Sequence, residues 1–363
     1  MDTNRLYFID AVRAFAILMM LQGHFIDTLM DVSYRDEANT AFQIWTYFRG
    51  ITAPTFFTIS GLIFSYLLIK AKRKGNIKQR IRKGLVRGLM LIGLGYLLRI
   101  PVFQWLIGEF NSYFLVVDVL QCIGLSLIGV VLLYQITLRK TLIFSILMLL
   151  VGLVIFTTEP LYRNLELANT PEIIANYMTK VHGSIFTILP WFGYMTFGAF
   201  ISTLFYRYLE RPKFKLGIII GFIVVGLFLI QKSSFVLMKL YFWSDIVLFK
   251  DVAYFNYLYT RLGNVLILFA LFYLFESFIK QPLILKIGQK TLSIYVIHFI
   301  IIWGSFTGYG LNQIIGKTLV PWQAIIGALI FLTTVCLISF YYAKTNAFLY
   351  AKIRLLIDKL KKT

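Results

Sequence analysis

Long apolar stretches, each near the length that crosses a bilayer, recur along the whole chain of 363 residues. A bilayer core is about 30 Å thick, and a helix needs roughly 20 mostly apolar residues to cross it. Polar or charged breaks separate the stretches, which lie near residues 8–30, 46–69, 85–107, 114–135, 141–158, 185–206, 216–236, 257–278, 290–308 and 319–343. We therefore expect an all-α polytopic membrane protein, a bundle of about ten transmembrane helices.

The composition agrees with a membrane class. Apolar residues make up 59% of the chain and charged residues 14%, with a mean hydropathy of +0.78. A formal net charge of +20 would suggest a nucleic-acid partner in a soluble protein, but the membrane explains this sign better. We expect no nucleic-acid partner. Cys122 and Cys336 both lie in apolar runs, so neither a disulfide framework nor a cysteine metal site is indicated.

The distribution of Lys and Arg between loops predicts the orientation. Short loops rich in these residues stay on the cytoplasmic side. The segment 70–87 carries nine basic residues and no acid, and basic residues also dominate every second loop after it and the C-terminal tail. The opposite loops are poorer in basic residues, which are interleaved with acids such as Asp36 and Glu37. We therefore expect both termini to be cytoplasmic.

One membrane domain accounts for most of the chain. Asp10 and Arg13 interrupt the first apolar run, so we expect residues 1–30 to stay in the membrane rather than form a cleaved signal peptide. We assign residues 1–346 to the transmembrane domain. Residues 347–363 alternate apolar side chains with lysines, like an amphipathic helix lying on anionic lipid. The expected location is a bacterial cytoplasmic membrane, and a homo-oligomer stays open.

The first predicted span carries a stripe of ionisable residues. Such groups are costly in lipid, so they usually face the interior of a bundle and indicate a pathway or a site. At 100° per residue, Asp10, Arg13, His24 and Asp27 share one face of a helix. Arg13 is expected near the cytoplasmic end and His24 in the outer half, roughly 16 Å away. A long, thin molecule with an anionic head would bridge the two.

Further polar residues fall inside or at the ends of other spans. On the outer side these are Arg49, Arg99, Asp118, Gln121 and Arg261, whereas His298 lies nearer the inside of the ninth span. A purely structural reading competes: Asp10 and Arg13 would form an i,i+3 ion pair, and the arginines would reach out to lipid headgroups. His298 would similarly be hydrogen-bonded across helices. His24 is better suited to proton transfer, because an imidazole titrates near neutral pH and serves as a general base.

The sequence lacks the motifs of several common enzyme families. The sequence contains no phosphate-binding Walker loop, no dinucleotide fingerprint, no His-Glu-x-x-His and no Gly-x-Ser-x-Gly. The three histidines lie on separate segments, so we expect no metal site.

Five short motifs, in order along the predicted spans, carry a resemblance to a known superfamily. They are Ile9-Asp10-Ala11-Val12-Arg13-Ala14 followed by His24; Ala53-Pro54-Thr55-Phe56-Phe57 with Ser60-Gly61; Val119-Leu120-Gln121-Cys122-Ile123-Gly124; Leu189-Pro190-Trp191-Phe192-Gly193; and Gly288 to Tyr295 ending in His298. They resemble the polytopic acyltransferases that group the acyltransferase-3 proteins with the heparan-alpha-glucosaminide N-acetyltransferase catalytic family. The resemblance extends in outline along most of the chain.

The resemblance implies an acyl-CoA-dependent acyltransferase. It would move an acyl group, usually acetyl, from cytoplasmic acyl-CoA to a hydroxyl or amine of a sugar or glycan at the outer face. His24 would be the catalytic histidine, as base or as acyl carrier, with Asp27 and His298 as further catalytic candidates. Arg13 would position acyl-CoA; the other candidates for binding it are Asp10, Arg82, Lys83, Arg87, Gln121 and Tyr295. The candidates for the substrate pocket are Asp118, Arg49, Arg99, Arg261 and Trp191.

A transporter is the main alternative. A secondary transporter or lipid-linked sugar flippase would use the same buried charges to relay protons. Against this alternative, the spacing of spans, loops and prolines contains no paired halves and no inverted repeat. A structural scaffold ranks last, because it leaves Asp10, Arg13 and His24 unexplained in lipid.

Overall fold

The computed structural model describes residues 6–110 and 112–360, with side chains up to residue 342. Its regular structure within these ranges is helical, apart from an isolated bridge between Met30 and Leu319. Seven helices are long and apolar enough to cross a membrane. They are α1 (Tyr7–Leu29), α2 (Thr40–Arg73), α5 (Val119–Ile136), α9 (Ile188–Tyr208), α10 (Phe214–Gln231), α13 (Tyr257–Leu274) and α18 (Pro321–Leu360). The predicted all-α membrane class is confirmed.

Three other predicted spans have a different character in the structure. α15 (Pro282–Gln289) and α16 (Thr291–Trp303) pass the same test only together and are bent by 69°, which gives an eighth candidate span. α6 (Thr141–Thr157) is apolar but shorter than the seven. α3 (Ile77–Arg99) is not among the candidates, and its first turns are rich in Lys and Arg. The larger predicted number of spans therefore stays a prediction.

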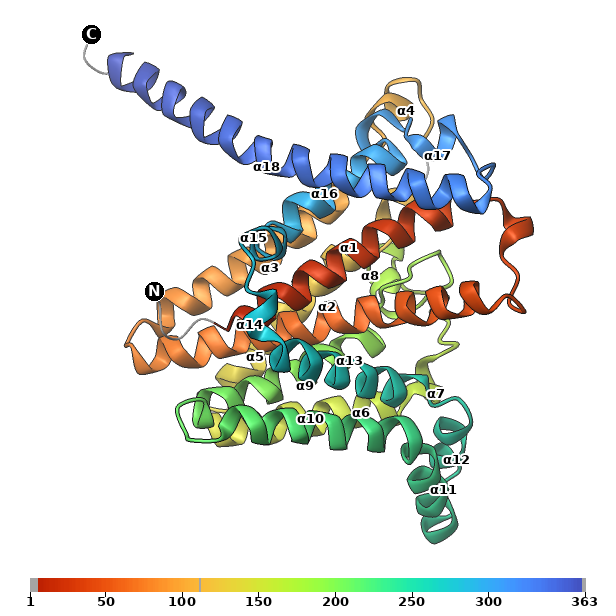
Figure 1. Cartoon of the computed structure of the whole chain (residues 1–363), viewed down its shortest axis with the longest axis vertical. Helices are drawn as coiled ribbons and strands as arrows, with labels where there is room; N and C mark the ends of the chain where they lie inside the picture. Colours follow the sequence, from red (N-terminus) through yellow and green to blue (C-terminus); the bar gives the residue numbers. More distant parts are fainter. Residues whose placement is uncertain (1–5, 111, 361–363) are drawn as a thin grey trace.

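Two predicted spans are interrupted. The stretch 85–107 breaks after Arg99, and a short α4 (Val102–Leu106) follows Pro101. Proline has no N–H and disfavours helical backbone in the residue before it, so α3 ends there. The stretch 216–236 ends as a continuous helix at Gln231, and α11 (Ser233–Ser244) and α12 (Val247–Tyr254) then form a hairpin that projects from the bundle (Figure 1).

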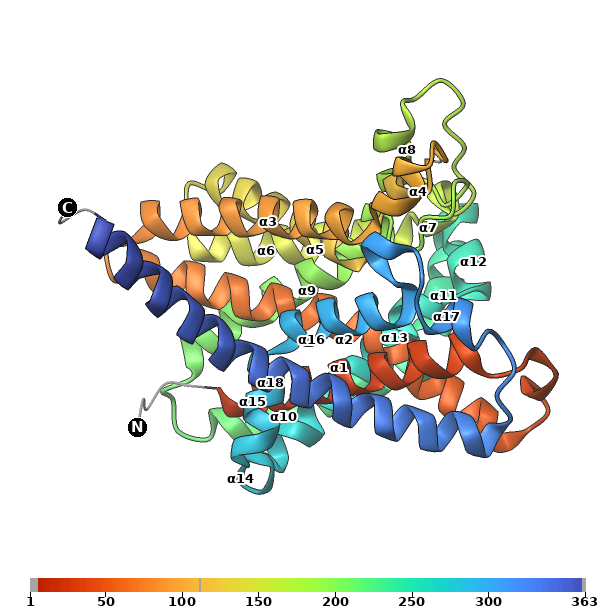
Figure 2. The same ribbon diagram turned by 90° about the horizontal axis from the view of Figure 1, so that it is seen from above.

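Short helices connect the long ones. These are η1 (Val32–Tyr34), η2 (Ser112–Leu115), α7 (Glu159–Tyr162), α8 (Glu172–Met178), α14 (Glu276–Ile279), η3 (Ser305–Thr307) and α17 (Leu311–Ile314). Apart from α14, they lie at the end of the bundle opposite the start of α1 (Figures 1 and 2). Of these, η2, η3 and α17 contribute residues to the wall of the largest cavity at His24 described below.

Helix α1 is central, and it packs against α2, α13, α15, α16 and α18. The most extensive contact between helices joins α2 and α9. Glycines permit this contact, because a Cβ on Gly61 would collide with the Met195 carbonyl and a Cβ on Gly198 with the Thr58 carbonyl. Small residues commonly let membrane helices approach this closely.

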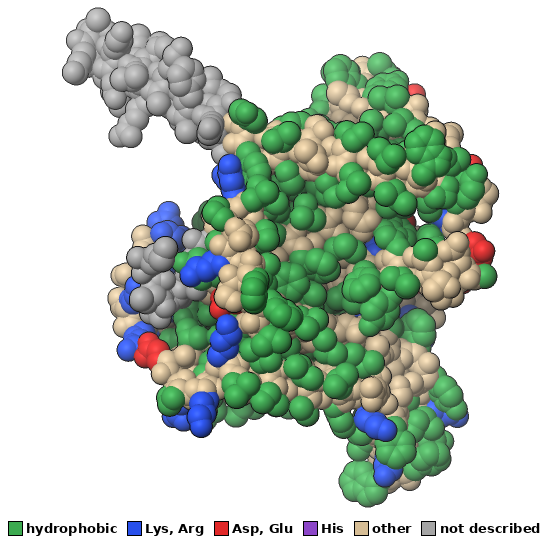
Figure 3. Space-filling model, in the orientation of Figure 1, with side chains coloured by type: hydrophobic (Ala, Val, Ile, Leu, Met, Phe, Trp, Pro, Cys, Tyr) green, Lys and Arg blue, Asp and Glu red, His purple; other side chains and the backbone are tan. Residues whose placement is uncertain are grey.

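Basic side chains gather at one end of the bundle. Lys70, Lys72 and Arg73 end α2, and Figure 3 shows Lys and Arg clustered there beside a largely hydrophobic middle. We call this the basic end. α1 begins and α18 ends on the same side of the molecule (Figures 1 and 2). The predicted amphipathic tail, residues 347–363, lies outside the residues whose side chains are described.

Candidate functional site

The polar stripe of α1 faces other helices, as its spacing predicts. Toward the basic end, Arg13 Nη1 lies 3.8 Å from the Asp10 carboxylate. Arg13 Nη2 donates a 2.6 Å hydrogen bond to Thr291 Oγ1 in the first turn of α16. Gly288 of α15 packs directly on the Asp10 carbonyl, where a Cβ would collide. This close approach brings the start of α16 to Arg13.

A narrow slot of about 90 Å³ begins at Arg13, and we call it the Arg13 slot. Its polar lining residues are Arg13, Arg87, Ser60, Thr291 and Tyr295. Its apolar lining residues are Ile17, Met20, Phe56, Ile59, Leu91, Val119, Leu120, Ile123 and Leu292. The slot is thus charged where Arg13 and Arg87 meet and apolar over most of its wall.

Two larger cavities meet at His24. The His24 cavity, about 460 Å³, is lined by His24, Asp27, Arg49, Arg99, Gln104, Tyr113, Asp118, Phe186, Trp303, Asn312 and Gln313 among others. A junction cavity of about 270 Å³ shares His24, Arg49 and Asp118 with the His24 cavity. It also shares Met20, Phe56 and Val119 with the Arg13 slot. Common walls therefore connect the Arg13 slot to His24.

Aromatic rings enclose the His24 imidazole. The His298 ring stacks on it with centroids 5.5 Å apart, and the Trp303 ring meets it edge-on at 5.2 Å. His298 is fully buried, and neither of its ring nitrogens has a hydrogen-bond partner within the described part of the chain. Tyr295 packs on His298 at 4.8 Å and also lines the Arg13 slot. The structure thus brings His24, His298 and Tyr295 together from α1 and α16.

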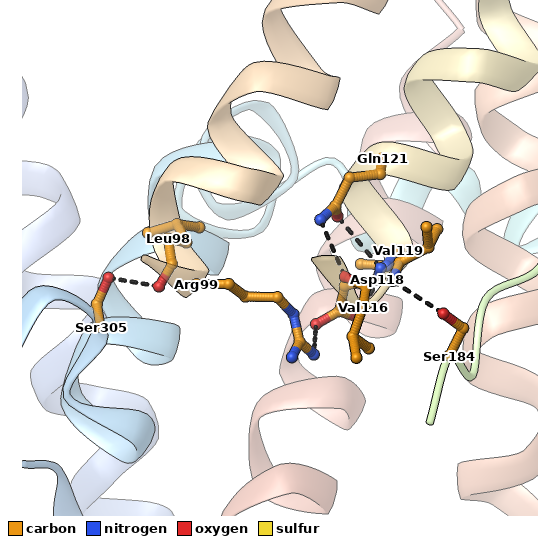
Figure 4. A network of polar contacts seen from close by, with 9 residues as sticks. Leu98, Arg99, Val116, Asp118, Val119, Gln121, Ser184 and Ser305 are labelled. Carbon is orange, nitrogen blue, oxygen red and sulfur yellow. Dashed lines mark hydrogen bonds and ion pairs between the residues drawn. The ribbon is translucent and has the colours of Figure 1, made fainter. Parts of the chain in front are cut away.

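Two ion pairs brace the His24 cavity. Asp27 pairs with Arg49 and so joins α1 to α2. Arg99, the last residue of α3, lies 2.9 Å from the Asp118 carboxylate (Figure 4). Asp118 is also the N-cap of α5: its carboxylate accepts a 2.8 Å hydrogen bond from Val119 N, the first backbone N–H of that helix. A carboxylate at a helix N-terminus and beside an arginine is stabilised from both sides.

Gln121 belongs to the cap of helix α5 rather than to the cavity walls described above. Its side chain is fully buried and completes the capping box of α5 by accepting from Asp118 N at 3.3 Å (Figure 4). Gly95 of α3 packs against the Gln121 side chain, where a Cβ would collide. The predicted contact of Gln121 with acyl-CoA would therefore have to displace this packing.

The remaining predicted residues fall into two groups. Arg82 and Lys83 are exposed in the first turns of α3, and Arg87 lies one helical turn beyond Lys83 at the Arg13 slot. Trp191 and Arg261 both line the junction cavity. Trp191 stacks on Phe57 at 5.2 Å, and the Arg261 guanidinium lies 5.2 Å above the Tyr257 ring.

Several site residues escaped the sequence reasoning. Thr291 holds Arg13, Trp303 contacts His24, and Gln104, Asn312 and Gln313 supply amides to the His24 cavity. The only sequence signal was the run from Gly288 to Tyr295, which contains Thr291. Among the described residues, no group of three His, Cys, Asp or Glu side chains is arranged to hold a metal ion.

Comparison with protein families identifies the chain. The family model described as heparan-alpha-glucosaminide N-acetyltransferase, catalytic, matches residues 5–242. This region contains Arg13, His24 and Asp118, whereas Arg261 and His298 follow it. A search of curated proteins gives no significant match. The chain therefore belongs to the heparan-alpha-glucosaminide N-acetyltransferase catalytic family, which together with its apolar helices indicates an integral membrane acetyltransferase.

Proposed function

We propose that this protein moves an acetyl group from cytoplasmic acetyl-CoA to a hydroxyl or amine of a sugar at the opposite face of the membrane. One observation carries the proposal: the junction cavity shares lining residues with both the Arg13 slot and the His24 cavity, so the three spaces follow one another from Arg13 to His24. A donor bound at Arg13 would extend along this series of cavities toward His24. The family supplies the acetyl-transfer chemistry.

The Arg13 slot suits the middle of an acyl-CoA molecule. At about 90 Å³ it has room for only a short segment of the donor, such as the unbranched cysteamine and β-alanine part of the pantetheine arm, and not for the nucleotide. Arg13 and Arg87 supply guanidinium donors for phosphate, and the exposed Arg82 and Lys83 extend the positive charge toward the surface. The nucleotide would therefore bind at the basic end, with the acyl thioester directed toward His24.

His24 would transfer the proton that the reaction requires. Its imidazole takes the proton from the acceptor hydroxyl or amine, whose oxygen or nitrogen attacks the thioester carbonyl carbon. The carbon–sulfur bond then breaks, and the CoA thiolate takes the proton from the imidazolium. In the second form of the mechanism, a nitrogen of His24 attacks the thioester carbon, the carbon–sulfur bond breaks, and the CoA thiolate takes the remaining N–H proton of the ring. The sugar hydroxyl or amine then attacks the acetyl carbon, and its proton returns to the released imidazole. His298 and Trp303 hold the imidazole in place in both forms.

The acceptor side lies in the His24 cavity. Asp27 is three residues after His24 and lines the same cavity, where its carboxylate is paired with Arg49. Amide groups from Gln104, Asn312 and Gln313 add donors and acceptors that match sugar hydroxyls. We assign these groups, with Arg99 and Asp118, to the sugar.

The direction of transfer follows from the proposed topology. Loops rich in Lys and Arg stay cytoplasmic, so the basic end, both termini and the Arg13 slot would face the cytoplasm. The His24 cavity would then open toward the outer face. We place the protein in a bacterial cytoplasmic membrane, with α3, α6 and the bent pair α15–α16 completing the predicted set of spans.

Donor binding is the direct test. We expect acetyl-CoA and CoA to raise the thermal midpoint of the purified protein, because a ligand that binds only the folded state stabilises it by about 2.7 kcal/mol at 100 times its Kd. Arg13→Ala should weaken that rise. Lys239→Ala, an exposed basic residue of α11, should leave it unchanged.

A different result would favour the rival function. If millimolar CoA does not raise the thermal midpoint of the wild-type protein, the proposal is contradicted and the transporter becomes the favoured function. Sugar or proton flux across vesicles containing the protein would then be the next assay.

A further inference from the structure

The α11–α12 hairpin interrupts the chain between two long helices that pack along each other, α10 and α13. Near the basic end, Lys215 in the first turn of α10 lies 3.5 Å from the Glu276 carboxylate, just after α13. The hairpin therefore lies at the other end of these two helices. In Figure 1 it points away from the bundle, across the direction of α10 rather than along it.

One face of α11 is exposed and almost entirely apolar, and we call it the α11 apolar face. Its side chains recur at helical spacing in two adjacent rows, Phe235, Lys239 and Phe242 beside Val236, Leu240 and Trp243. Trp243 is 86% exposed and Phe242 is 77% exposed. The buried residues of α11, Ser233 and Leu237, lie on the other side of the helix. The exposed side of α11 is thus the side that would normally be hidden from water.

The α11 apolar face continues a surface that faces lipid. Only Lys232 separates α11 from α10, which is long and apolar enough to cross the membrane. α10 has its own row of exposed apolar side chains, among them Ile220 and Val224. Exposed apolar patches of this kind mark surfaces that interact with protein or with a membrane. Here the neighbouring helix indicates the membrane.

The length of the hairpin determines how it can meet a membrane. α11 has 12 residues and spans about 18 Å, which is too short to cross a bilayer core of about 30 Å. Apolar segments of this length typically lie at the interface or re-enter the membrane. Trp and Tyr favour the interface, and the hairpin carries Tyr241 and Trp243.

The two lysines of the helices in the hairpin also suit an interface. Lys239 Nζ lies 4.7 Å from the centroid of the Phe235 ring, and Lys250 Nζ lies 5.6 Å from that of Tyr241. The aliphatic part of each lysine therefore runs over apolar surface. Lysines beside lipid place their stems in this way and extend the ammonium group to the headgroups.

Polar contacts fix the base of the hairpin to the bundle. Asn256, the residue before α13, donates a 2.6 Å hydrogen bond to Ser233 Oγ at the start of α11. Arg163 lies 4.4 Å above the Phe255 ring at the end of α12. Glu159 accepts hydrogen bonds of 2.9 and 3.0 Å from Arg163 Nε and so raises the pKa of its guanidinium. The hairpin is therefore held in place at its base while its apolar face stays exposed.

We propose that the α11–α12 hairpin is an interfacial membrane anchor. The α11 apolar face lies against lipid, at the level of the glycerol groups and upper acyl chains, in the leaflet opposite the basic end. Because its base is fixed to the bundle, the hairpin sets the depth of that end of the protein in the leaflet. This proposal does not depend on acetyl transfer or on which leaflet is cytoplasmic.

Spin labels on the full-length protein in lipid nanodiscs test the proposal. Val236→Cys and Leu240→Cys, made with Cys122 and Cys336 changed to alanine, each carry a nitroxide on the α11 apolar face. Electron paramagnetic resonance measures collisions with oxygen, which concentrates in lipid, and with a nickel chelate, which stays in water. We expect both labels to collide mainly with oxygen.

Two exposed positions outside the hairpin provide matched controls. A label at Val224→Cys on α10 gives the lipid reference, and a label at Val181→Cys in the loop before α9 gives the water reference. Each labelled variant must keep the thermal midpoint of the cysteine-free protein. If either hairpin variant does not, Phe235→Cys on the same face replaces it.

The collision pattern decides between lipid, water and protein. Labels on α11 that match the label at Val224 support the anchor. Strong collision with the nickel chelate at either position would put the α11 apolar face in water. Weak collision with both reagents would put it against a second copy of the chain or another protein. Either of these two results overturns the proposal.

Discussion

His24 is the residue on which the proposed chemistry depends. Replacing it with alanine removes the only imidazole that lines both the His24 cavity and the junction cavity among the described residues. General acid–base catalysis contributes about 10²- to 10⁴-fold, so we expect His24→Ala to lower acetyl transfer by a factor in that range. Acetylation of membrane glycans, measured by mass spectrometry in cells expressing each variant, gives the readout.

A histidine at the same end of the molecule provides the control. His182 is exposed in the loop before α9, and His182→Ala should transfer acetyl at the wild-type rate. His24→Ala should keep the acetyl-CoA thermal shift, which separates lost chemistry from lost folding. Wild-type transfer by a folded His24→Ala variant would rule out the assignment.

Residues on one helix were predictable, and their partners were not. The shared face of Arg13, His24 and Asp27 follows from helical periodicity, which is local in sequence. The hydrogen bond from Arg13 to Thr291 joins residues 278 positions apart, and the contact of Trp303 with His24 likewise depends on how α16 packs on α1. No spacing rule encodes such contacts. Arg49 was read as a residue that reaches lipid or lines a pocket, and its ion pair with Asp27 appeared only in the structure.

At the scale of elements, the contact between α2 and α9 depends on glycine. The Met195 carbonyl leaves no room for a Cβ on Gly61, and backbone cannot move aside as a side chain can. Overpacking of this kind costs about 1–3 kcal/mol, so Gly61→Ala should lower the thermal midpoint in detergent.

The matched control is another glycine within a helix. Gly93 of α3 has nothing within 4 Å of an added Cβ. Gly93→Ala should therefore leave the midpoint unchanged or raise it slightly, because alanine is the better helix former. Equal midpoints for the two variants would show that α2 and α9 do not need the close approach.

Hydropathy predicted where the long helices lie better than where they end or bend. It located all seven long apolar helices, because burying the backbone in lipid requires continuous apolar sequence. It missed the bend between α15 and α16, the break after Arg99 and the α11–α12 hairpin. These features lie where apolar sequence continues through a turn, and hydropathy alone does not distinguish a straight span from a bent one.

At the scale of the whole molecule, the site is built from residues inside the region that the family model matches and from residues that follow this region. The matched region, residues 5–242, supplies α1 with Arg13 and His24 and α5 with its cap Asp118. α13 and α16 follow that region and supply Arg261, Thr291 and His298. The Arg13 slot and the aromatic enclosure of His24 therefore require packing of the later helices on α1. A fragment ending at residue 242 would lack one wall of the Arg13 slot and one side of the aromatic rings around His24.

The orientation of the bundle decides which face holds the donor. If the basic end is cytoplasmic, Arg82→Cys at the start of α3 should react with a membrane-impermeant maleimide only after the cells are opened. Val181→Cys, 61% exposed at the opposite end, should react in intact cells. The native Cys122 and Cys336 are buried free thiols, and changing both to alanine gives a silent background. Labelling of Arg82→Cys in intact cells would place the basic end outside. Acetyl-CoA, which is made in the cytoplasm, would then have no access to Arg13, and the proposed transfer would fail with the topology.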